Sequence, residues 1–417
     1  MFAATLNTET LRLKQASEFV VYSRSSRPTL VKFRVSSRGS EVSLFASLQR
    51  HVRKNTTRQG AGILSSAVPF EVLVKFARFA WKRFWLLLME ELAPSKGRSG
   101  SYDRPPPAYV SDNYRQGIKQ GEIAKSEFAL FYGLECPWCH RCLLAMNFYG
   151  LNDETLGAPI INSVRVYPSL DGKWVLAQAD RKEKPGTTAG NFLENLLSMR
   201  DLKEIYRKIE PSFAGRATAP LLIDLRAARI VSNESSDIVR FLREIARVRA
   251  EGLVNDLYPY NYQKQIEQDR SLIHEKLNNG VYKVGFAKNQ TAYNEAESDV
   301  FETLQYLDEK LARQRYVSGT PFPSESDVFL FPTLIRFDSV YHTLFRCSRR
   351  KLTEFHTLHA WLRDMVQSHR IQVSGTFDIE ETMTSYFRSL FPLNPSGIVP
   401  SCDVGCLEDP HGREALK

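Results

Sequence analysis

The sequence has few cysteines and no long apolar run. Only six of its 417 residues are cysteine, and three of these, Cys136, Cys139 and Cys142, fall within seven residues. Such crowding does not suit the disulfide framework of a secreted protein, so reactive thiols in a reducing compartment are the better interpretation. No stretch approaches the roughly eighteen uninterrupted apolar residues of a membrane-spanning helix. With 43% hydrophobic and 25% charged residues, the composition is typical of a soluble globular protein.

Acidic residues are scarce in the first sixty residues, which contain eleven Lys or Arg but only Glu9, Glu18 and Glu41. This segment carries +8 of the net charge of +9, so the rest of the chain is nearly neutral and does not indicate a nucleic-acid-binding face. Basic, Ser-rich, acid-poor N-termini without a continuous apolar core are typical of organelle transit peptides. We predict a transit peptide at 1–65, addressed to the chloroplast or alternatively to the mitochondrion. A plain disordered tail is the other interpretation.

Residues 70–94 combine aromatic and aliphatic side chains with a few cations and end at Pro94. This pattern predicts a basic amphipathic helix. The helix could pack on the protein body or contact a membrane surface, and both interpretations stay open. The composition of Ser95–Pro107 predicts a linker. We therefore assign residues 66–119 to an amphipathic helix and a linker.

Residues 120–248 alternate short apolar strands with helices. The predicted strands are Phe128–Tyr132, Asn162–Tyr167, Ala219–Asp224 and Arg229–Ser232, and the predicted helices are Leu143–Tyr149, Asp201–Lys208 and Asn233–Ile245. Residues 178–199 are polar and predict irregular structure. The order strand–helix–strand, then strand–strand–helix, is that of an α/β thioredoxin-like domain.

Residues 255–375 carry helical patterns throughout. Apolar side chains at 296, 300, 301, 304, 307 and 311 form one face of a long helix. Ser324–Asp327 has the Ser-x-x-Asp capping pattern, directly before a buried helix that starts at Val328. Leu358–Met365 marks another helix. These patterns predict an all-α C-terminal domain at 255–375, followed by an extension at 376–417 that folds back over the site.

The segment Cys136-Pro-Trp-Cys-His-Arg141 lies between a predicted strand and a predicted helix. A cysteine at a helix N-terminus has its thiolate stabilised by unpaired backbone N–H groups and by the helix dipole. Pro137 suits the first helical position because it lacks an N–H group that would have no partner there. We therefore expect Cys136 to be a nucleophile at neutral pH, with Cys139 less exposed and less acidic. His140 and Arg141 are expected to add positive potential.

A Cys-x-x-Cys motif also occurs in zinc sites, but these need a second ligand pair. The only candidate is Cys402-x-x-x-Cys406 with His411, in a Pro-rich tail. We therefore predict no metal site.

Two further features are consistent with thiol chemistry on glutathione. Pro220 opens a predicted strand, and in thioredoxin-like folds such a proline is cis, faces the cysteine and follows a residue whose backbone binds the peptide part of glutathione. Glu234 and Ser235 stand at a helix start and suit the γ-glutamyl amine and carboxylate. Ordinary helix capping would also explain this pair.

With these motifs, residues 104–400 resemble the glutathionyl-hydroquinone reductases, the xi class of the glutathione transferase superfamily. The resemblance is carried by the motifs Cys136–Arg141, Gly215–Pro220, Val231–Ser236, Asn278–Lys283, Leu334–Tyr341 and Asn394–Pro400. The C-terminal extension separates this class from the omega class. The fold that the resemblance implies is a thioredoxin-like domain followed by an all-α glutathione-transferase domain.

The resemblance also implies roles for individual residues. Cys136 falls on the nucleophile, and Tyr282 on the tyrosine that protonates the leaving carbon. Glutathione, as co-substrate, would be bound by Trp174, Arg216, Ala219, Pro220, Glu234 and Ser235. Tyr341 and Tyr386 would line the pocket of a quinone-derived aromatic substrate. The family resemblance further implies a homodimer, while the nearly neutral charge of the chain after residue 60 predicts no nucleic-acid partner.

The sequence departs from the family pattern at two positions, since the family commonly has alanine at the position of Cys139 and valine at that of Ala219. Cys139 could resolve Cys136 in a dithiol, glutaredoxin-like deglutathionylase, or simply face the core. Cys142 is expected to pack in the core. A non-catalytic ligand carrier remains a third alternative, although it would not need the three tyrosines.

Overall fold

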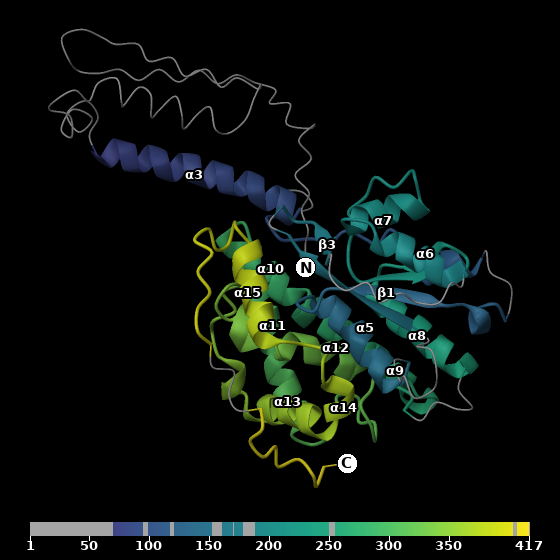
Figure 1. The fold of residues 1–417 in the computed structure, drawn as a ribbon. Helices are drawn as coiled ribbons and strands as arrows, with labels where there is room; N and C mark the ends of the chain where they lie inside the picture. Colours follow the sequence, from purple (N-terminus) through teal and green to yellow (C-terminus); the bar gives the residue numbers. More distant parts are fainter. Residues whose placement is uncertain are drawn as a thin grey trace, which may run out of the picture. The chain divides into compact units, whose positions relative to one another are not determined.

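The computed structural model describes residues 70–94, 99–116, 121–151, 161–169, 171–177, 188–249, 255–402 and 407–416 (Figure 1). The predicted transit peptide at 1–65 lies outside the described residues. The chain divides into two compact units, and the described part of the larger unit begins at Met89. All candidate site residues belong to this larger unit.

Most of helix α3, Phe70–Leu92, belongs to the smaller unit. Taken by itself, it is the amphipathic helix that the sequence predicts. Its exposed side chains include several large apolar ones: Phe70, Phe76, Phe79, Trp81, Phe84 and Leu87. In the part of the chain that the structure describes, no helix combines the length and apolarity needed to cross a membrane.

A five-stranded sheet forms the centre of the first domain, with the strand order β3-β2-β1-β4-β5. The strands are β1 Phe128–Tyr132, β2 Ile161–Pro168, β3 Trp174–Leu176, β4 Leu221–Asp224 and β5 Arg229–Ser232. β1 pairs in parallel with β2 and antiparallel with β4, while β3 and β5 pair antiparallel with β2 and β4. This arrangement confirms the thioredoxin-like fold.

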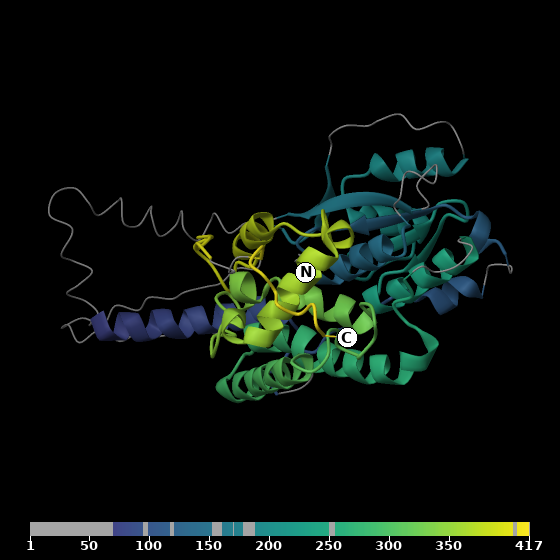
Figure 2. The same ribbon diagram turned by 90° about the horizontal axis from the view of Figure 1, so that it is seen from below.

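The helices of this domain cover both faces of the sheet, with α5 and α8 on one and α6 and α7 on the other (Figures 1 and 2). Their bounds are α4 Ser111–Arg115, α5 Pro137–Phe148, α6 Thr188–Leu197, α7 Leu202–Ile209 and α8 Ser235–Arg249, with a 3₁₀ turn at Ile123–Lys125. The prediction of irregular structure at 178–199 was wrong for 188–197. Ala189, Leu193 and Leu196 are spaced for one helical face and are buried on it.

The second domain is entirely helical and packs against α5 through α12 and α14. Its helices are α9 Gln263–Leu272, α10 Gly280–Gly285, α11 Gln290–Leu311, α12 Glu325–Leu334, α13 His356–Ser368, α14 Arg370–Val373 and α15 Ile379–Ser389, with 3₁₀ turns at Tyr260–Tyr262 and Leu352–Glu354. The predicted capping box is present, because the Ser324 N–H and hydroxyl both donate to Asp327 at 2.9 Å.

Two π-helical segments interrupt this domain, at Ile273–Asn278 and Phe337–Tyr341. Such segments shift the side chains that follow around the helix axis and often lie at functional sites. The first is separated by one residue from α10, which carries Tyr282, and the second contains Tyr341. Gly285 permits the close packing here, because a Cβ atom on it would come within 2.6 Å of the Phe345 ring.

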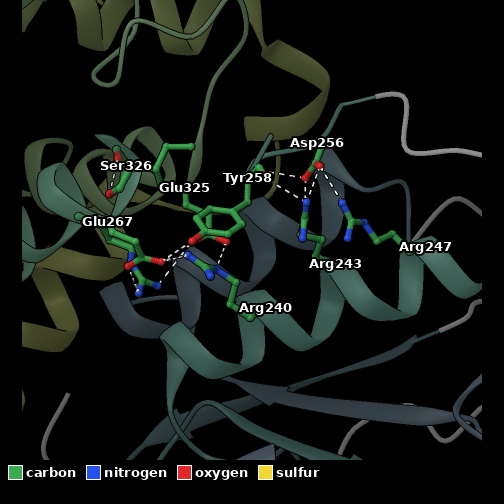
Figure 3. A network of polar contacts seen from close by, with 10 residues as sticks. Arg240, Arg243, Arg247, Asp256, Tyr258, Glu267, Glu325 and Ser326 are labelled. Atoms are coloured by element: carbon green, nitrogen blue, oxygen red, sulfur yellow. Dashed lines mark hydrogen bonds and ion pairs between the residues drawn. The ribbon is translucent and has the colours of Figure 1, made fainter. Parts of the chain in front are cut away.

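A network of arginines and carboxylates joins α8 to the helical domain (Figure 3). Arg240 on α8 binds Glu325 at the start of α12, and it also binds Glu267 on α9 at 2.7 Å. The Arg240 guanidinium lies 3.4 Å above the Tyr258 ring. Arg270 supplies a second cation to the fully buried Glu325, at 3.4 Å. Since the carboxylate is shared by two arginines, its burial is compensated, and the Arg240 pairs link α8 to α9 and α12.

The C-terminal extension folds over the site only in part. α15 brings Tyr386 into the core, but residues 407–416 pack at the end of α11 and along α13. There Arg413 donates to the carbonyls of Leu311, Gln314 and Arg315 at 2.8–2.9 Å. The expectation that the extension folds back over the site does not hold for residues 407–416, because the buried Arg413 fixes this part elsewhere.

Candidate active site

Cys136 is the N-cap residue of α5, with Pro137 at the first helical position. The Cys139 N–H group lies 3.4 Å from the Cys136 sulfur, and the Ala219 carbonyl lies 3.8 Å from it. Burial favours the neutral thiol, whereas hydrogen bonds from the Cys139 thiol and N–H group favour the thiolate, and the pKa of Cys136 lies well below its usual range. The geometry thus gives the thiolate that the sequence predicts.

The other two cysteines of the cluster stay protonated. Burial, together with the neighbouring Cys136 charge, raises the pKa of Cys139 well above its usual range, and Gly133 N–H lies 3.4 Å from its sulfur. Burial likewise raises the pKa of Cys142, whose thiol faces the carbonyls of Trp138 and Ser235. One reactive thiol therefore stands beside two neutral ones.

His140 does not add positive potential, in contrast to the expectation from the sequence. Its Nδ1 accepts a hydrogen bond from Arg336 at 2.8 Å, and its Nε2 lies 2.8 Å from the Thr376 hydroxyl. Because that hydroxyl donates to the Val373 carbonyl, His140 carries its proton on Nε2. Burial and the Arg336 charge lower the pKa of His140 far below neutrality. His140 is a neutral structural link between α5 and the helical domain.

The same Arg336 also fixes the loop before Cys136. Its guanidinium donates to the carbonyls of Leu134 and Glu135 at 3.0 and 3.2 Å, and to Pro332 at 3.0 Å. Arg336 itself is buried. The helical domain thereby holds both the loop and the first turn of α5.

The Ala219–Pro220 peptide bond is cis, and Ala219 precedes β4 opposite Cys136. Arg216, three residues earlier, donates to the Glu91 carbonyl at 2.6 Å. Trp174 lies at the start of β3 and is buried. Its ring covers Gly133, where a Cβ atom would come within 2.3 Å of the indole, so only glycine fits.

Glu234 and Ser235 stand at the start of α8, beside a cavity of about 280 Å³. Glu234 accepts from the Ser235 and Ser236 side chains and from the Ser236 N–H group, so it caps the helix. Arg104 approaches the same carboxylate at 3.5 Å and stacks 3.9 Å above the Trp138 ring. The residues 105–107 complete this wall of the cavity. Glu234 therefore both caps α8 and lines a cavity large enough for a ligand.

Charged side chains of both signs line the cavity: Arg104 and Lys283 lie there with Asp103, Glu234 and Glu275. The buried Arg141 lies behind Trp138, 4.5 Å from its ring. Burial and these cations lower the pKa of His274, on the cavity wall, to about 3. Arg141 is fixed by Ser235 and Asn278. A ligand that carries both an ammonium group and carboxylates matches this mixed lining.

Three buried tyrosines form the side of the site that the helical domain supplies. The Tyr282 and Tyr386 hydroxyls lie 2.7 Å apart, and the Tyr341 ring lies 5.9 Å from that of Tyr282. Trp138, two residues after Cys136, stacks on Tyr282 with 6.0 Å between ring centres. Burial raises the pKa of all three tyrosines, so each hydroxyl is a proton donor at neutral pH, and the charge of Cys136 contributes to the rise at Tyr341.

Sequence reasoning missed three residues of the site: Arg104, Glu135 and Arg336. Arg104 falls in the stretch predicted to be a linker, and its neighbours give no periodic signal. Arg336 lies in the Leu334–Tyr341 motif that carried the family resemblance, so this motif pointed to its position but not to its contacts. The chain position of Glu135, directly before the nucleophile, was the only available signal for it.

Comparison with protein families agrees with this architecture. Residues 135–245 match the glutathione S-transferase N-terminal domain, and residues 290–364 match the glutathione S-transferase C-terminal domain.

Individual relatives show to which class of this superfamily the chain belongs. The chain is 34% identical over 290 residues to glutathionyl-hydroquinone reductase YqjG of Escherichia coli, covering 70% of this chain and 83% of that protein. It is 32% identical to glutathionyl-hydroquinone reductase PcpF of Sphingobium chlorophenolicum, covering 69% and 86%. A glutathione-bound YqjG structure matches with a TM-score of 0.60 over 69% of this chain and 88% of that one. The xi-class glutathione transferase of Natrialba magadii matches with a TM-score of 0.62 and 33% identity, covering 74% and 88%. The chain therefore belongs to the glutathionyl-hydroquinone reductases, the xi class of the glutathione transferase superfamily.

Proposed function

We propose that this enzyme reduces glutathionyl-hydroquinones to hydroquinones through a mixed disulfide between Cys136 and glutathione. The observation that carries the proposal is the joint placement of a single stabilised thiolate, Cys136, and a protonated tyrosine pair, Tyr282 and Tyr386. A thiolate alone suits many exchange reactions, whereas proton donors opposite it suit the release of a carbon leaving group. The names of YqjG and PcpF support this substrate class.

In the first step, the Cys136 thiolate attacks the sulfur of the glutathionyl thioether. A sulfur–sulfur bond forms while the carbon–sulfur bond breaks, so the carbon is reduced and the two sulfurs are oxidised. Tyr282 gives its hydroxyl proton to the leaving carbon, and the hydrogen bond between Tyr282 and Tyr386 stabilises the resulting phenolate. The hydroquinone then departs.

In the second step, a further glutathione thiolate attacks the glutathione sulfur of the mixed disulfide. Glutathione disulfide leaves, and Cys136 returns as a thiolate. We assign the binding of glutathione to Trp174, Arg216, Ala219, Pro220, Glu234 and Ser235, with Arg104 as an addition from the geometry. Glu234 suits the γ-glutamyl amine, and Arg104 with Lys283 suits its carboxylate. The glutathione-bound YqjG structure supports glutathione as co-substrate.

An assay of glutathionyl-menadiol reduction by the Cys136→Ser and Cys139→Ser variants tests this mechanism. Cys136→Ser should lose turnover, because serine is not ionised at neutral pH, while Cys139→Ser should retain it. Absence of turnover by the wild-type enzyme, with glutathione still bound, would refute the reductase and leave the carrier alternative.

A dithiol deglutathionylase is the second candidate, because the Cys139 thiol donates a hydrogen bond to Cys136. Resolution by Cys139 would release glutathione and leave a Cys136–Cys139 disulfide. An equal loss of turnover in both serine variants would favour this mechanism over the first.

We further propose that α3 contacts an anionic membrane surface. Lys75, Arg78 and Lys82 are spaced to lie along one stripe of the helix, whereas the exposed aromatic side chains lie mostly outside it. This pairing of cations with exposed aromatic rings suits the interface of an acidic bilayer. The full chain should co-sediment with vesicles that contain phosphatidylglycerol and less with pure phosphatidylcholine vesicles.

Two variants separate the contributions to this contact. Phe76→Gln with Phe79→Gln should abolish sedimentation, and Lys75→Gln with Lys82→Gln should remove its lipid-charge dependence. Concentration-dependent self-association without vesicle binding would instead assign α3 to a second copy of the chain.

Two proposals concern the context of the enzyme. We propose that residues 1–65 direct it to the chloroplast, so a fusion of this segment to a fluorescent protein should accumulate in plastids; mitochondrial accumulation would favour the alternative.

We also propose a homodimer, which light scattering at micromolar concentration should detect as twice the mass of one chain.

A further inference from the structure

Glu135 stands directly before Cys136, in the loop between β1 and α5, and its side chain is buried. Among the described residues, neither of its carboxyl oxygens has a hydrogen-bond partner. Its backbone carbonyl, in contrast, is held by Arg336. The loop is therefore fixed while the carboxyl group has no fixed partner. A buried carboxyl group without hydrogen bonds is costly, so its presence beside the nucleophile calls for a functional reason.

The surroundings of the carboxyl group place it at the site. One of its oxygens lies over Gly133, on the side where the Trp174 ring covers this glycine. On the resemblance described above, Trp174 is the residue that covers glutathione. The carboxyl group thus lies beside the indole against which glutathione is expected to bind, on the residue that directly precedes the nucleophile.

The charged groups around Glu135 do not neutralise it. Arg165 on β2 is within electrostatic reach but forms its ion pair with Glu381 on α15. Arg336 contacts only the backbone of Glu135, and the Cys136 charge and Glu381 both repel a second negative charge. Burial, with the charge on Cys136 adding to it, raises the pKa of Glu135 to about 7. The group can therefore exchange a proton near neutral pH.

Other side chains near Cys136 are unsuited to accept a proton. The acceptor nitrogen of His140 is occupied by Arg336. Burial keeps Cys139 and the three tyrosines protonated, and Tyr282 must remain so to act as an acid. Of these neighbours of Cys136, Glu135 is therefore the one suited to accept a proton.

We infer that Glu135 is the general base that takes the thiol proton of the second glutathione. This role rests on the proposed function, of which it completes the second step. The Glu135 carboxylate accepts the proton, and the thiolate sulfur attacks the glutathione sulfur bound to Cys136. A new sulfur–sulfur bond forms as the old one breaks, with Cys136 as the leaving thiolate. Glu135 then releases its proton to water, which balances the proton that Tyr282 delivers in the first step.

The test separates the two steps. The mixed disulfide is prepared by reacting Cys136 with glutathione disulfide, so this preparation does not depend on any hydroquinone substrate. Its resolution by added glutathione is then followed from pH 5.5 to 9 in stopped flow. In the wild type, the rate should rise with a midpoint near 7. In Glu135→Gln, it should fall about 10²-fold at pH 7 and follow the ionisation of glutathione's own thiol, near the ordinary cysteine value of about 8.5.

Three controls distinguish catalysis from structure. Single-turnover release of hydroquinone by Glu135→Gln should stay within about two-fold of wild type, because the first step does not use the base. Formate should partly restore resolution in Glu135→Ala, which a purely structural role would not allow. Glu302→Gln, which removes an exposed carboxylate on α11 instead, should keep the wild-type pH profile. Wild-type resolution by Glu135→Gln at every pH, or equal slowing of both steps, would overturn the inference. Failure of hydroquinone release by the wild type, with resolution still dependent on Glu135, would refute the substrate class alone.

Discussion

The thioredoxin-like domain stabilises the reactive sulfur mainly through its own first turn of helix, whereas the helical domain reaches the same site through side chains. The Cys136 sulfur accepts hydrogen bonds from Cys139, three residues away in the first turn of α5. Tyr282, Arg336 and Tyr386 come from separate segments of the other domain. The helix of Tyr282 follows one π-helical segment, and Arg336 directly precedes the other. The nucleophile is thus stabilised by local structure, whereas the groups around it are brought together by the tertiary structure.

Substitutions in the two domains should therefore have different effects on the site. A substitution in the first turn of α5 changes one pKa or one contact, since the helix N-terminus remains. A substitution among the side chains that the helical domain supplies to the site disturbs several elements at once, because each of them joins segments that are far apart in sequence.

Arg336→Met should have the largest effect. It leaves the carbonyls of Leu134, Glu135 and Pro332 without their donor in a buried place, so the free energy of unfolding should fall by about 3 kcal/mol or more. Denaturant unfolding measures this. Arg349→Met, an exposed arginine, should change it by less than about 0.5 kcal/mol. Equal effects of the two would mean that the helical domain does not hold the Cys136 loop.

Tyr282→Phe should slow hydroquinone release about 10²-fold, because the leaving carbon loses its proton donor while the ring packing is kept. Resolution of the mixed disulfide should not change. Single-turnover measurements of both steps check this, with Tyr341→Phe as the matched variant. If the variants lose the same amount, the tyrosines act together and no single proton donor can be assigned.

Arg104→Ala should raise the KM for glutathione about ten-fold, or about 1.4 kcal/mol, with a small effect on kcat. The reason is the loss of a cation from the cavity beside Glu234. Arg104→Lys keeps the charge but not the planar stacking on Trp138. Its KM should therefore lie between the KM of the wild type and that of Arg104→Ala. An unchanged KM in Arg104→Ala would remove Arg104 from the glutathione site.

Cys139→Ala should have the smallest effect. It removes the thiol hydrogen bond to Cys136 but keeps the Cys139 N–H group and the helix start, so the pKa of Cys136 should rise by about one unit. The low pKa in the wild type means that its thiolate persists into acidic solution, and the variant should lose it at a higher pH. The pH dependence of alkylation by iodoacetamide measures both values. A rise of several units would make Cys139 the main source of the thiolate.

Much of the fold could be predicted, because its signals are local. The apolar run Phe128–Tyr132, the capping box at Ser324 and the one-sided pattern of α11 each depend on neighbours within a few residues. The helix Thr188–Leu197 was missed because its apolar face is short and stands in a polar stretch. Its buried residues became recognisable only against the sheet.

The candidate site divides in the same way. Cys136, Ala219–Pro220 and Glu234–Ser235 stand at element ends and could be named from the sequence. The protonation of His140 and the pKa of Glu135 could not, because burial sets them and burial comes from other segments.

The sequence by itself determined that a cysteine followed by proline would start a helix, and hence that Cys136 would be the reactive thiol. The tertiary structure decided which of its neighbours carry protons. Arg336 lies 196 residues from His140 and makes it neutral, and Tyr282 meets Tyr386 across 104 residues. Both outcomes depend on the removal of water by distant segments, and desolvation is a property that no local pattern encodes.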